Sequence, residues 1–207
     1  MQSEKADLIR KKIQEEGVAL VTGQLGREPT EIEFEDEVQV IEGVFAKRQK
    51  QPEVPIPLLA TVHLGMGRDI VIQNMSPSVS ITILQTLQEH QFFQKGNEVE
   101  EGPTRVRPSS PFEVWFLRAN PEVIRELFPD VEEYWKQESK EMPAYWQVIL
   151  PDQRGRWPWS AEGCDAMSLL GQPVLGELSP EFAQAKSLNE QRVMEEFQRV
   201  STTPSPT

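Results

Sequence analysis

Arginine and tryptophan side chains gather in one short stretch of the sequence, "PDQRGRWPW", at residues 151–159. A guanidinium supplies positive charge and hydrogen-bond donors to an anionic group, and an indole supplies a flat face for stacking. We call this stretch the Arg/Trp loop and identify it as a candidate site for an anionic or planar ligand or for a partner. Its candidate residues are Asp152, Arg154, Arg156, Trp157 and Trp159.

The same loop also has an architectural interpretation. Pro151 ends the preceding strand because proline cannot donate to a ladder, and Gly155 permits a positive φ. Asp152 accepts backbone N–H groups in the turn. The tryptophan rings then cover an edge of the core, and Arg156 binds Asp152 or a backbone carbonyl. This interpretation explains the composition of the loop most simply.

Three further groups are weak candidates for catalysis, namely His63, Cys164 and Asp165. A Cys–His pair can act as nucleophile and base. However, His63 falls on an apolar strand, and no helix N-terminus or basic cluster is predicted beside Cys164 to lower the pKa of its thiol. The sequence contains no EF-hand loop, no H-E-x-x-H motif and no phosphate-binding glycine motif. We therefore predict neither a metal site nor a cofactor.

The composition is that of a globular protein. Of the 207 residues, 38% are apolar and 26% are charged, which is enough apolar material for a real core. The single cysteine excludes an internal disulfide. No apolar run approaches the roughly 20 residues that span a bilayer, and the N-terminus lacks the apolar segment of a signal peptide. We expect a cytoplasmic protein that does not enter a membrane.

Acidic residues dominate the charge. The net charge is −12 and the pI is about 4.7, so direct binding to nucleic acid is not expected. Residues 28–42 carry seven acids and no base, and apolar residues alternate with acids there as in a strand with one solvent-exposed face. The solvent-exposed face is a candidate acidic interaction face for a basic protein partner. Its members are Glu31, Glu33, Glu35 and Glu37.

Helices and strands alternate irregularly along the chain, which predicts an α+β fold with a mainly antiparallel sheet packed by helices. Apolar runs predict strands at residues 18–22, 58–64, 69–74, 111–118 and 144–150. Helices are predicted at residues 3–16, after Ser76-Pro77, after Asn120-Pro121 and after Ser179-Pro180, and a second short turn or helix is predicted at residues 131–139. A turn is predicted at residues 23–30 and a proline-rich linker at residues 47–57.

These elements divide the chain into four parts. We predict an N-terminal helix with an acidic β extension at 1–50 and an α+β core at 51–170. A C-terminal helix follows at 171–200, and residues 201–207 form a disordered tail.

A resemblance to a known family covers roughly residues 55–165. Members of the bacterial domain-of-unknown-function family 4262 typically carry a W-P-D-x-x-G-R-F-P-W signature after a strand. The loop resembles this signature at Pro151, Asp152, Gly155, Arg156, Pro158 and Trp159, with Leu150 and Trp157 in place of the usual aromatic residues.

The segment "ATVHLGMGRDIVIQ" resembles the strand pair of that family more weakly. The matching residues are Thr61, Val62, Leu64, Gly67 and Val71. Arg68 stands about where the family has a histidine, and we include Arg68 among the candidate binding residues. The family has no established activity, so the resemblance implies a fold and a boundary and no reaction.

Two functional hypotheses follow. The leading one is a non-enzymatic, acidic protein-interaction module of a bacterial or phage cytosol, with nucleic-acid mimicry in a conflict, defence or anti-defence system as a special case. The alternative is a small-molecule binding protein, or a hydrolase with His63 as base, that acts at the Arg/Trp loop. A cleft beside the loop is the structural feature that the alternative requires.

Overall fold

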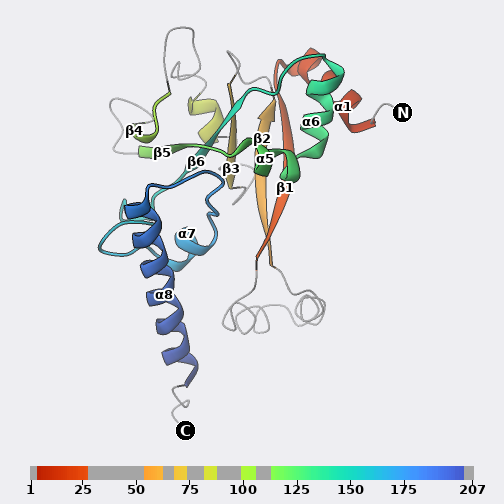
Figure 1. Cartoon of the computed structure of the whole chain (residues 1–207). Helices are drawn as coiled ribbons and strands as arrows, with labels where there is room; N and C mark the ends of the chain where they lie inside the picture. Colours follow the sequence, from red (N-terminus) through yellow and green to blue (C-terminus); the bar gives the residue numbers. More distant parts are fainter. Residues whose placement is uncertain are drawn as a thin grey trace.

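A single mixed sheet organises the α+β fold of this protein (Figure 1). The computed structural model describes residues 4–27, 54–62, 68–73, 82–87, 99–105 and 113–202. The strands are Ala19–Arg27 (β1), Val54–Val62 (β2), Arg68–Gln73 (β3), Gly102–Arg105 (β4), Glu113–Arg118 (β5) and Ala144–Ile149 (β6). Their order in the sheet is β1-β2-β3-β6-β5-β4.

All neighbouring strands in this sheet are antiparallel except β3 and β6, which are parallel. Arg68 pairs with Ala144 and Ile72 with Val148, so both strands begin at the same end of the sheet. The Arg/Trp loop leaves β6 at the opposite end. The predominantly antiparallel sheet agrees with the sequence-based prediction.

Three helices cover one face of the sheet, namely Glu4–Glu16 (α1), Pro121–Leu127 (α5) and Pro129–Gln137 (α6). Asn120 caps α5, because its side-chain oxygen accepts the N–H of Glu122 at 2.9 Å. Ile124 and Phe128 are fully buried here, and burial of such a side chain contributes about 1.5–3 kcal/mol. α1 packs against α6 beside the sheet (Figure 1).

The other face of the sheet buries a second cluster. The residues at 82–87 are helical, and Ile83, Leu84 and Leu87 pack there. Their partners include Ile72 from β3 and Phe116 from β5. The helical spacing predicted for this segment is confirmed, whereas Ser76 and Pro77 lie outside the described residues.

A C-terminal unit of loop and helix packs on the first face, over β5 and β6. It contains the short helix Ala166–Leu170 (α7) and the long helix Pro180–Thr202 (α8). Ser179 caps α8 as predicted, with its hydroxyl 3.3 Å from the N–H of Phe182. Figure 1 shows the C-terminal half of α8 extending away from the sheet.

Three boundaries and one helix differ from the sequence-based predictions. β1 continues to Arg27, although a turn was expected from residue 23, and β2 begins at Val54 inside the expected linker. α7 was not predicted. α8 ends at Thr202, so the first two residues of the predicted disordered tail are helical. Residues 203–207 lie outside the described residues.

Proline is compatible with β2 because of where it falls. Pro55 and Pro57 pair with Gly26 and Gln24 of β1, whereas the described pairing with β3 begins only at Leu58. Residues two apart direct their N–H groups to the same side of a strand. The absent N–H groups of Pro55 and Pro57 therefore fall on the side of β2 where no pairing with β3 is described, so no ladder hydrogen bond is lost there.

Candidate functional site

The Arg/Trp loop is organised around the carboxylate of Asp152. Oδ1 accepts the N–H groups of Arg154 and Arg156, both at 2.8 Å. Oδ2 accepts Nε of Arg156 at 2.8 Å and lies 2.6 Å from its Nη2. Gly155 adopts a φ of 76°, the left-handed conformation that glycine adopts at low cost. The turn and the ion pair predicted by the architectural interpretation are both present.

The pKa of Asp152 is lowered from its ordinary value. Burial of the side chain, which is 1% exposed, acts in the opposite direction. The hydrogen bonds from the Arg156 guanidinium and from backbone N–H groups outweigh it. Asp152 is therefore an ionised structural anchor at neutral pH, and its charge largely neutralises that of Arg156.

The tryptophans of the loop belong to an aromatic cluster that joins β5 to α8. Trp159 is 5% exposed, and its ring centroid lies 5.0 Å from that of Trp115 and 5.5 Å from that of Phe182. Trp157 meets Trp115 edge-on at 5.6 Å. Such pairs add about 0.5–1.5 kcal/mol each beyond their buried area. The indoles therefore hold α8 on the sheet.

The remaining candidate residues are not all brought to the loop. Arg154 is exposed and its side chain makes no hydrogen bond or ion pair with the described residues. Arg68 begins β3 at the end of the sheet opposite the loop. His63 and the acidic face of Glu31, Glu33, Glu35 and Glu37 lie outside the described residues.

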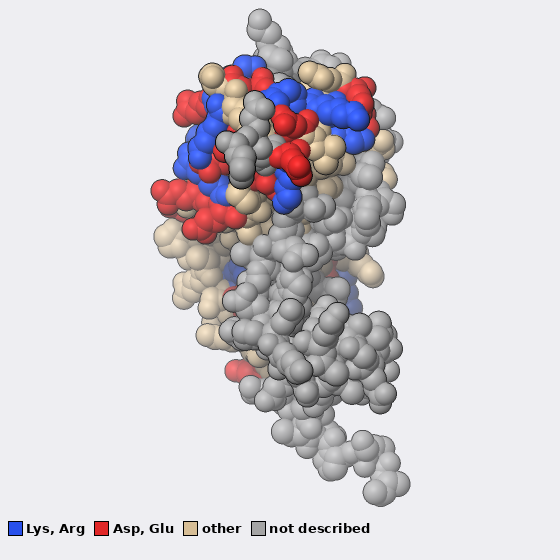
Figure 2. Space-filling model, turned by 90° about the vertical axis from the view of Figure 1, so that its right-hand side faces the viewer, with Lys and Arg blue, Asp and Glu red and all other residues tan. Residues whose placement is uncertain are grey.

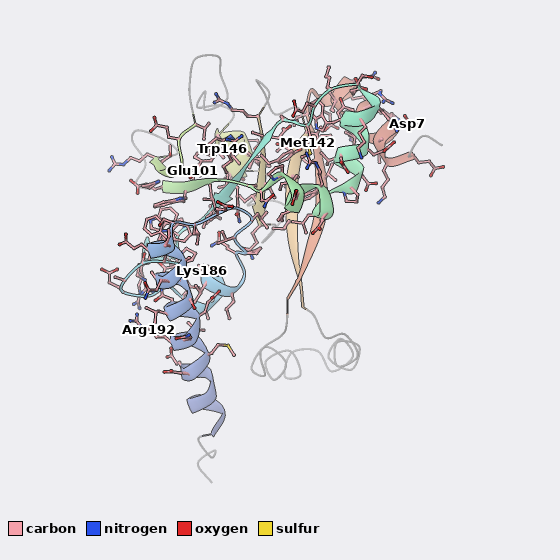
Figure 3. All side chains as sticks on the ribbon, viewed as in Figure 1. Asp7, Glu101, Met142, Trp146, Lys186 and Arg192 are labelled. Carbon is pink, nitrogen blue, oxygen red and sulfur yellow. The ribbon has the colours of Figure 1, made fainter. Side chains whose placement is uncertain are left out.

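A cleft of about 340 Å³ lies directly beside the loop, between residues 156–166 and α8. We call it the α8 cleft. Its loop wall includes Arg156, Glu162, Cys164 and Asp165, and its helix wall consists of Asn189, Arg192, Val193 and Glu196. The helix residues are spaced i, i+3, i+4 and i+7, so they form one stripe of α8. Arg192, labelled in Figure 3, comes from this stripe.

Cys164 is buried at the base of the α8 cleft and donates to the carbonyl of Arg156 at 3.5 Å. Burial, followed by the charges of Asp152 and Asp165, raises the pKa of its thiol to about 11. The thiol is therefore protonated at neutral pH, and the thiolate that a nucleophile requires is scarce.

Asp152, Cys164 and Asp165 each present one potential metal ligand, and these atoms lie within 4.8 Å of one another. All three groups already have partners. Asp152 binds Arg156, and the two oxygens of Asp165 accept the N–H and the hydroxyl of Ser168 at 2.9 Å each. A cation would compete with the Arg156 guanidinium and with a thiol proton, so this donor set fits a metal poorly.

Three buried amides that sequence reasoning missed hold the C-terminal unit in place. Asn189 donates to the carbonyls of Pro158 and Ser160, both at 2.9 Å. Gln172 accepts the N–H of Leu150 at 2.7 Å, and Gln147 accepts the N–H of Leu175 at 2.8 Å. For Asn189, its position in the apolar stripe of α8 was the available signal.

Charge is distributed differently along α1 and along the C-terminal unit. α1 carries four acidic and four basic residues, and Figure 2 shows acidic and basic side chains interspersed on the face that α1 lies on. Ion pairs such as Lys5–Asp130 and Arg10–Glu138 link α1 to α6 and the residue after it. In contrast, residues 160–196 carry seven acidic and two basic residues. Residues 160–196 therefore carry a net charge of −5.

No family model, no curated protein and no solved structure matches this chain. Within the described residues, no helix combines the length and the apolar composition that a bilayer crossing requires.

Proposed function

We propose that this protein is a non-enzymatic interaction module whose α8 cleft receives a lysine or arginine side chain of a basic protein partner. The observation that carries the proposal is the balance of charge in the cleft. Arg156 is neutralised by Asp152, so Arg192 is the remaining base among the lining residues. Three carboxylates, those of Glu162, Asp165 and Glu196, also line the cleft, so negative charge exceeds positive charge there.

The raised pKa of the Cys164 thiol in the cleft also agrees with an excess of negative charge there. Burial is the largest cause of the raised pKa of Cys164, and among the nearby charges Asp152 and Asp165 raise it more than Arg156 lowers it. The carboxylates thus outweigh the guanidinium near this thiol, which favours the entry of a cationic side chain. Long aliphatic stems also suit the site, because Val193 and Ala166 line it beside the charged groups.

A binding role also agrees with the state of the reactive groups. Asp152 is held as an ionised anchor, and the thiol of Cys164 is protonated at neutral pH. The acidic surface of residues 160–196 would steer a basic partner toward the cleft and raise the association rate.

The experiment compares association rates for a short fluorescent peptide of alternating lysine and glycine. The test variant carries Glu162→Gln and Glu196→Gln, which remove two charges at the α8 cleft. The matched control carries Glu4→Gln and Glu15→Gln, which remove two exposed charges from α1. We expect the test variant to associate several-fold more slowly than the control and to show a flatter salt dependence.

Equal rates and equal salt slopes in the two variants would contradict the proposal, since only net charge would then matter. Capture from host lysate with the parent and the test variant would next identify the partner. A basic protein retained by the parent and lost by the test variant is the expected result.

Three observations favour the second candidate, a small-molecule binding protein at the Arg/Trp loop. A cleft does lie beside the loop, its volume falls within the range of small-ligand sites, and Nη1 of Arg156 makes no hydrogen bond with the described residues. A planar anion such as benzoate would then bind and quench the fluorescence of Trp157. Saturable quenching in the parent that is lost in Arg156→Lys would favour this candidate.

A further inference from the structure

β1 is an edge strand that lacks the usual protection against pairing with another chain. The strand order of the sheet ends at β1 on one side and at β4 on the other. β4 is protected, because it is four residues long, contains Pro103 and ends at Arg105. β1 is nine residues long, and its positions 19–26 contain neither a proline nor a charged residue. A long uncharged edge of this kind is a template for a further strand.

The helices that contact β1 pack on one face of the strand. Ala19 and Val21 belong to the core cluster beneath α1, α5 and α6, and α1 and α5 both contact β1. Helices on a face do not use the N–H and C=O groups of an edge, which lie in the plane of the sheet. Within the described residues, β2 is the only strand that pairs with β1. The outer edge of β1 is therefore available for backbone hydrogen bonds.

Part of β1 also belongs to a two-stranded extension of the sheet. Residues 24–27 of β1 pair with residues 54–57 of β2, whereas the described pairing of β2 with β3 begins at Leu58. Figure 1 shows this extension projecting beyond β3. A ribbon of only two strands is at best marginally stable in water. A strand added along β1 would stabilise it.

The sequence of β1 complements itself when two copies run antiparallel. If the two copies meet at Gly23, Val21 of one copy lies opposite Leu25 of the second copy, and Thr22 lies opposite Gln24. Residues directly opposite each other in an antiparallel pair share one face of the sheet. Apolar residues would therefore meet apolar residues, and polar residues would meet polar ones.

We propose that two copies of this protein associate through β1, in an antiparallel pairing about a two-fold axis at Gly23 that joins the two sheets. Residues 24–27 of each copy then pair with residues 19–22 of the other, so each two-stranded extension gains a third strand. Arg27 falls opposite Ala19, and no like charges are opposed. A two-fold pairing closes after two copies, so the product is a dimer. This association does not depend on the function proposed for the α8 cleft.

Sedimentation equilibrium of the full chain tests the inference. The parent is expected to form a dimer that dissociates on dilution. Thr22→Lys with Gln24→Lys brings like charges opposite each other across the pairing and is expected to weaken the dimer at least about ten-fold. Thr22→Glu with Gln24→Lys brings opposite charges together at the same positions and is expected to restore most of the affinity.

The control for net charge carries Glu4→Gln and Glu15→Gln, which change the charge by the same amount as the two lysines but on the exposed surface of α1. It is expected to associate as the parent does. Hydrogen exchange of the unsubstituted parent provides a second measurement. The amides of residues 19–27 are expected to exchange several-fold more slowly in the dimer than in the diluted monomer, and those of β4 equally in both.

A parent that is monomeric at every concentration overturns the inference. So does a lysine pair that dimerises as tightly as the parent, or an opposite-charge pair that dimerises as weakly as the lysine pair. A dimer in which the amides of β1 are no better protected than in the monomer also overturns it, because another surface would then hold the two copies together.

Discussion

The α-carbon of Gly176 faces the backbone carbonyl of Arg118 so closely that a β-carbon built on it would lie 2.1 Å from the oxygen. This approach allows the bridge between Gly176 and Ala119 and the hydrogen bond of 2.8 Å from the N–H of Asn120 to the carbonyl of Leu175. The segment that leads into α8 is thereby joined to the end of β5.

Gly176→Ala is expected to destabilise the protein by roughly 2 to 3 kcal/mol, because the backbone must move to admit the methyl group. Urea unfolding followed by circular dichroism measures the change. Gly155→Ala is the control, since open space surrounds its β-carbon position and only the positive φ opposes the substitution, at about 1 kcal/mol. An equal or larger loss in the control would contradict the steric account.

Trp159→Ala is expected to lower the free energy of unfolding by about 3 to 5 kcal/mol, since it removes a buried ring from the centre of the aromatic cluster. Arg154→Ala, in the same loop, is expected to change it by less than about 0.5 kcal/mol because that side chain is exposed. If Trp159→Ala unfolds at the same urea concentration as the parent, the loop does not anchor α8.

Asp152→Asn is expected to lower the free energy of unfolding by roughly 2 to 3 kcal/mol at neutral pH, because it weakens the charged hydrogen bonds to Arg156. The lowered native pKa of Asp152 makes its contribution dependent on pH. The contribution of the Asp152 carboxylate to the free energy of unfolding is complete above the pKa of an aspartate in the unfolded chain, about 3.9. It is lost as the pH falls through the lower pKa of Asp152 in the native protein.

The stability difference between the parent and Asp152→Asn should therefore shrink as the pH is lowered from about 5. Chemical unfolding at a series of pH values tests this. A difference that stays constant down to the lowest pH at which the parent folds would show that the ion pair does not perturb the carboxyl group.

Cys164 is expected to react with iodoacetamide far more slowly in the native protein than in urea, since burial and nearby carboxylates raise the pKa of the thiol to about 11. The unfolded chain is the internal control because it contains the same single cysteine. Mass spectrometry of quenched samples at pH 8 gives both rates. Similar rates would mean that the thiol is accessible and ionises normally.

Much of the second half of the fold could be predicted from local sequence signals. Asn120 and Ser179 each precede a proline, and both cap the helices that begin there. Val114 and Phe116 alternate with less buried residues along β5, and the pattern identified that strand. These signals act over a few residues, so they are visible without knowledge of the tertiary structure.

The first half was harder because tertiary pairing overrides local preference there. Gly23 and Gly26 favour a turn, yet β1 continues through both because β2 pairs with it along its whole length. Pro55 and Pro57 suggest a linker, yet they lie in β2 on a stretch with one partner strand. Neither outcome depends on residues close in sequence.

Part of the candidate site was visible in the sequence and part was not. The Asx turn at Asp152 and the positive φ of Gly155 follow from residue types and were predicted. The α8 cleft was not, because Arg192 and Glu196 are far from the loop in sequence. They reach it through tertiary packing, in which Asn189 donates to the carbonyls of Pro158 and Ser160 and Arg192 donates to the carbonyl of Ala161.

The parallel pairing of β3 with β6 also determines the order in which the chain can mature during synthesis. Residue 68 pairs with residue 144, so 76 positions of chain must emerge before the centre of the sheet can close. Until then β3 is an open edge that carries Ile70, Val71 and Ile72, all of which end fully buried. β6 lies between β3 and β5, so this apolar edge stays open to non-native strand pairing until β6 has left the ribosome.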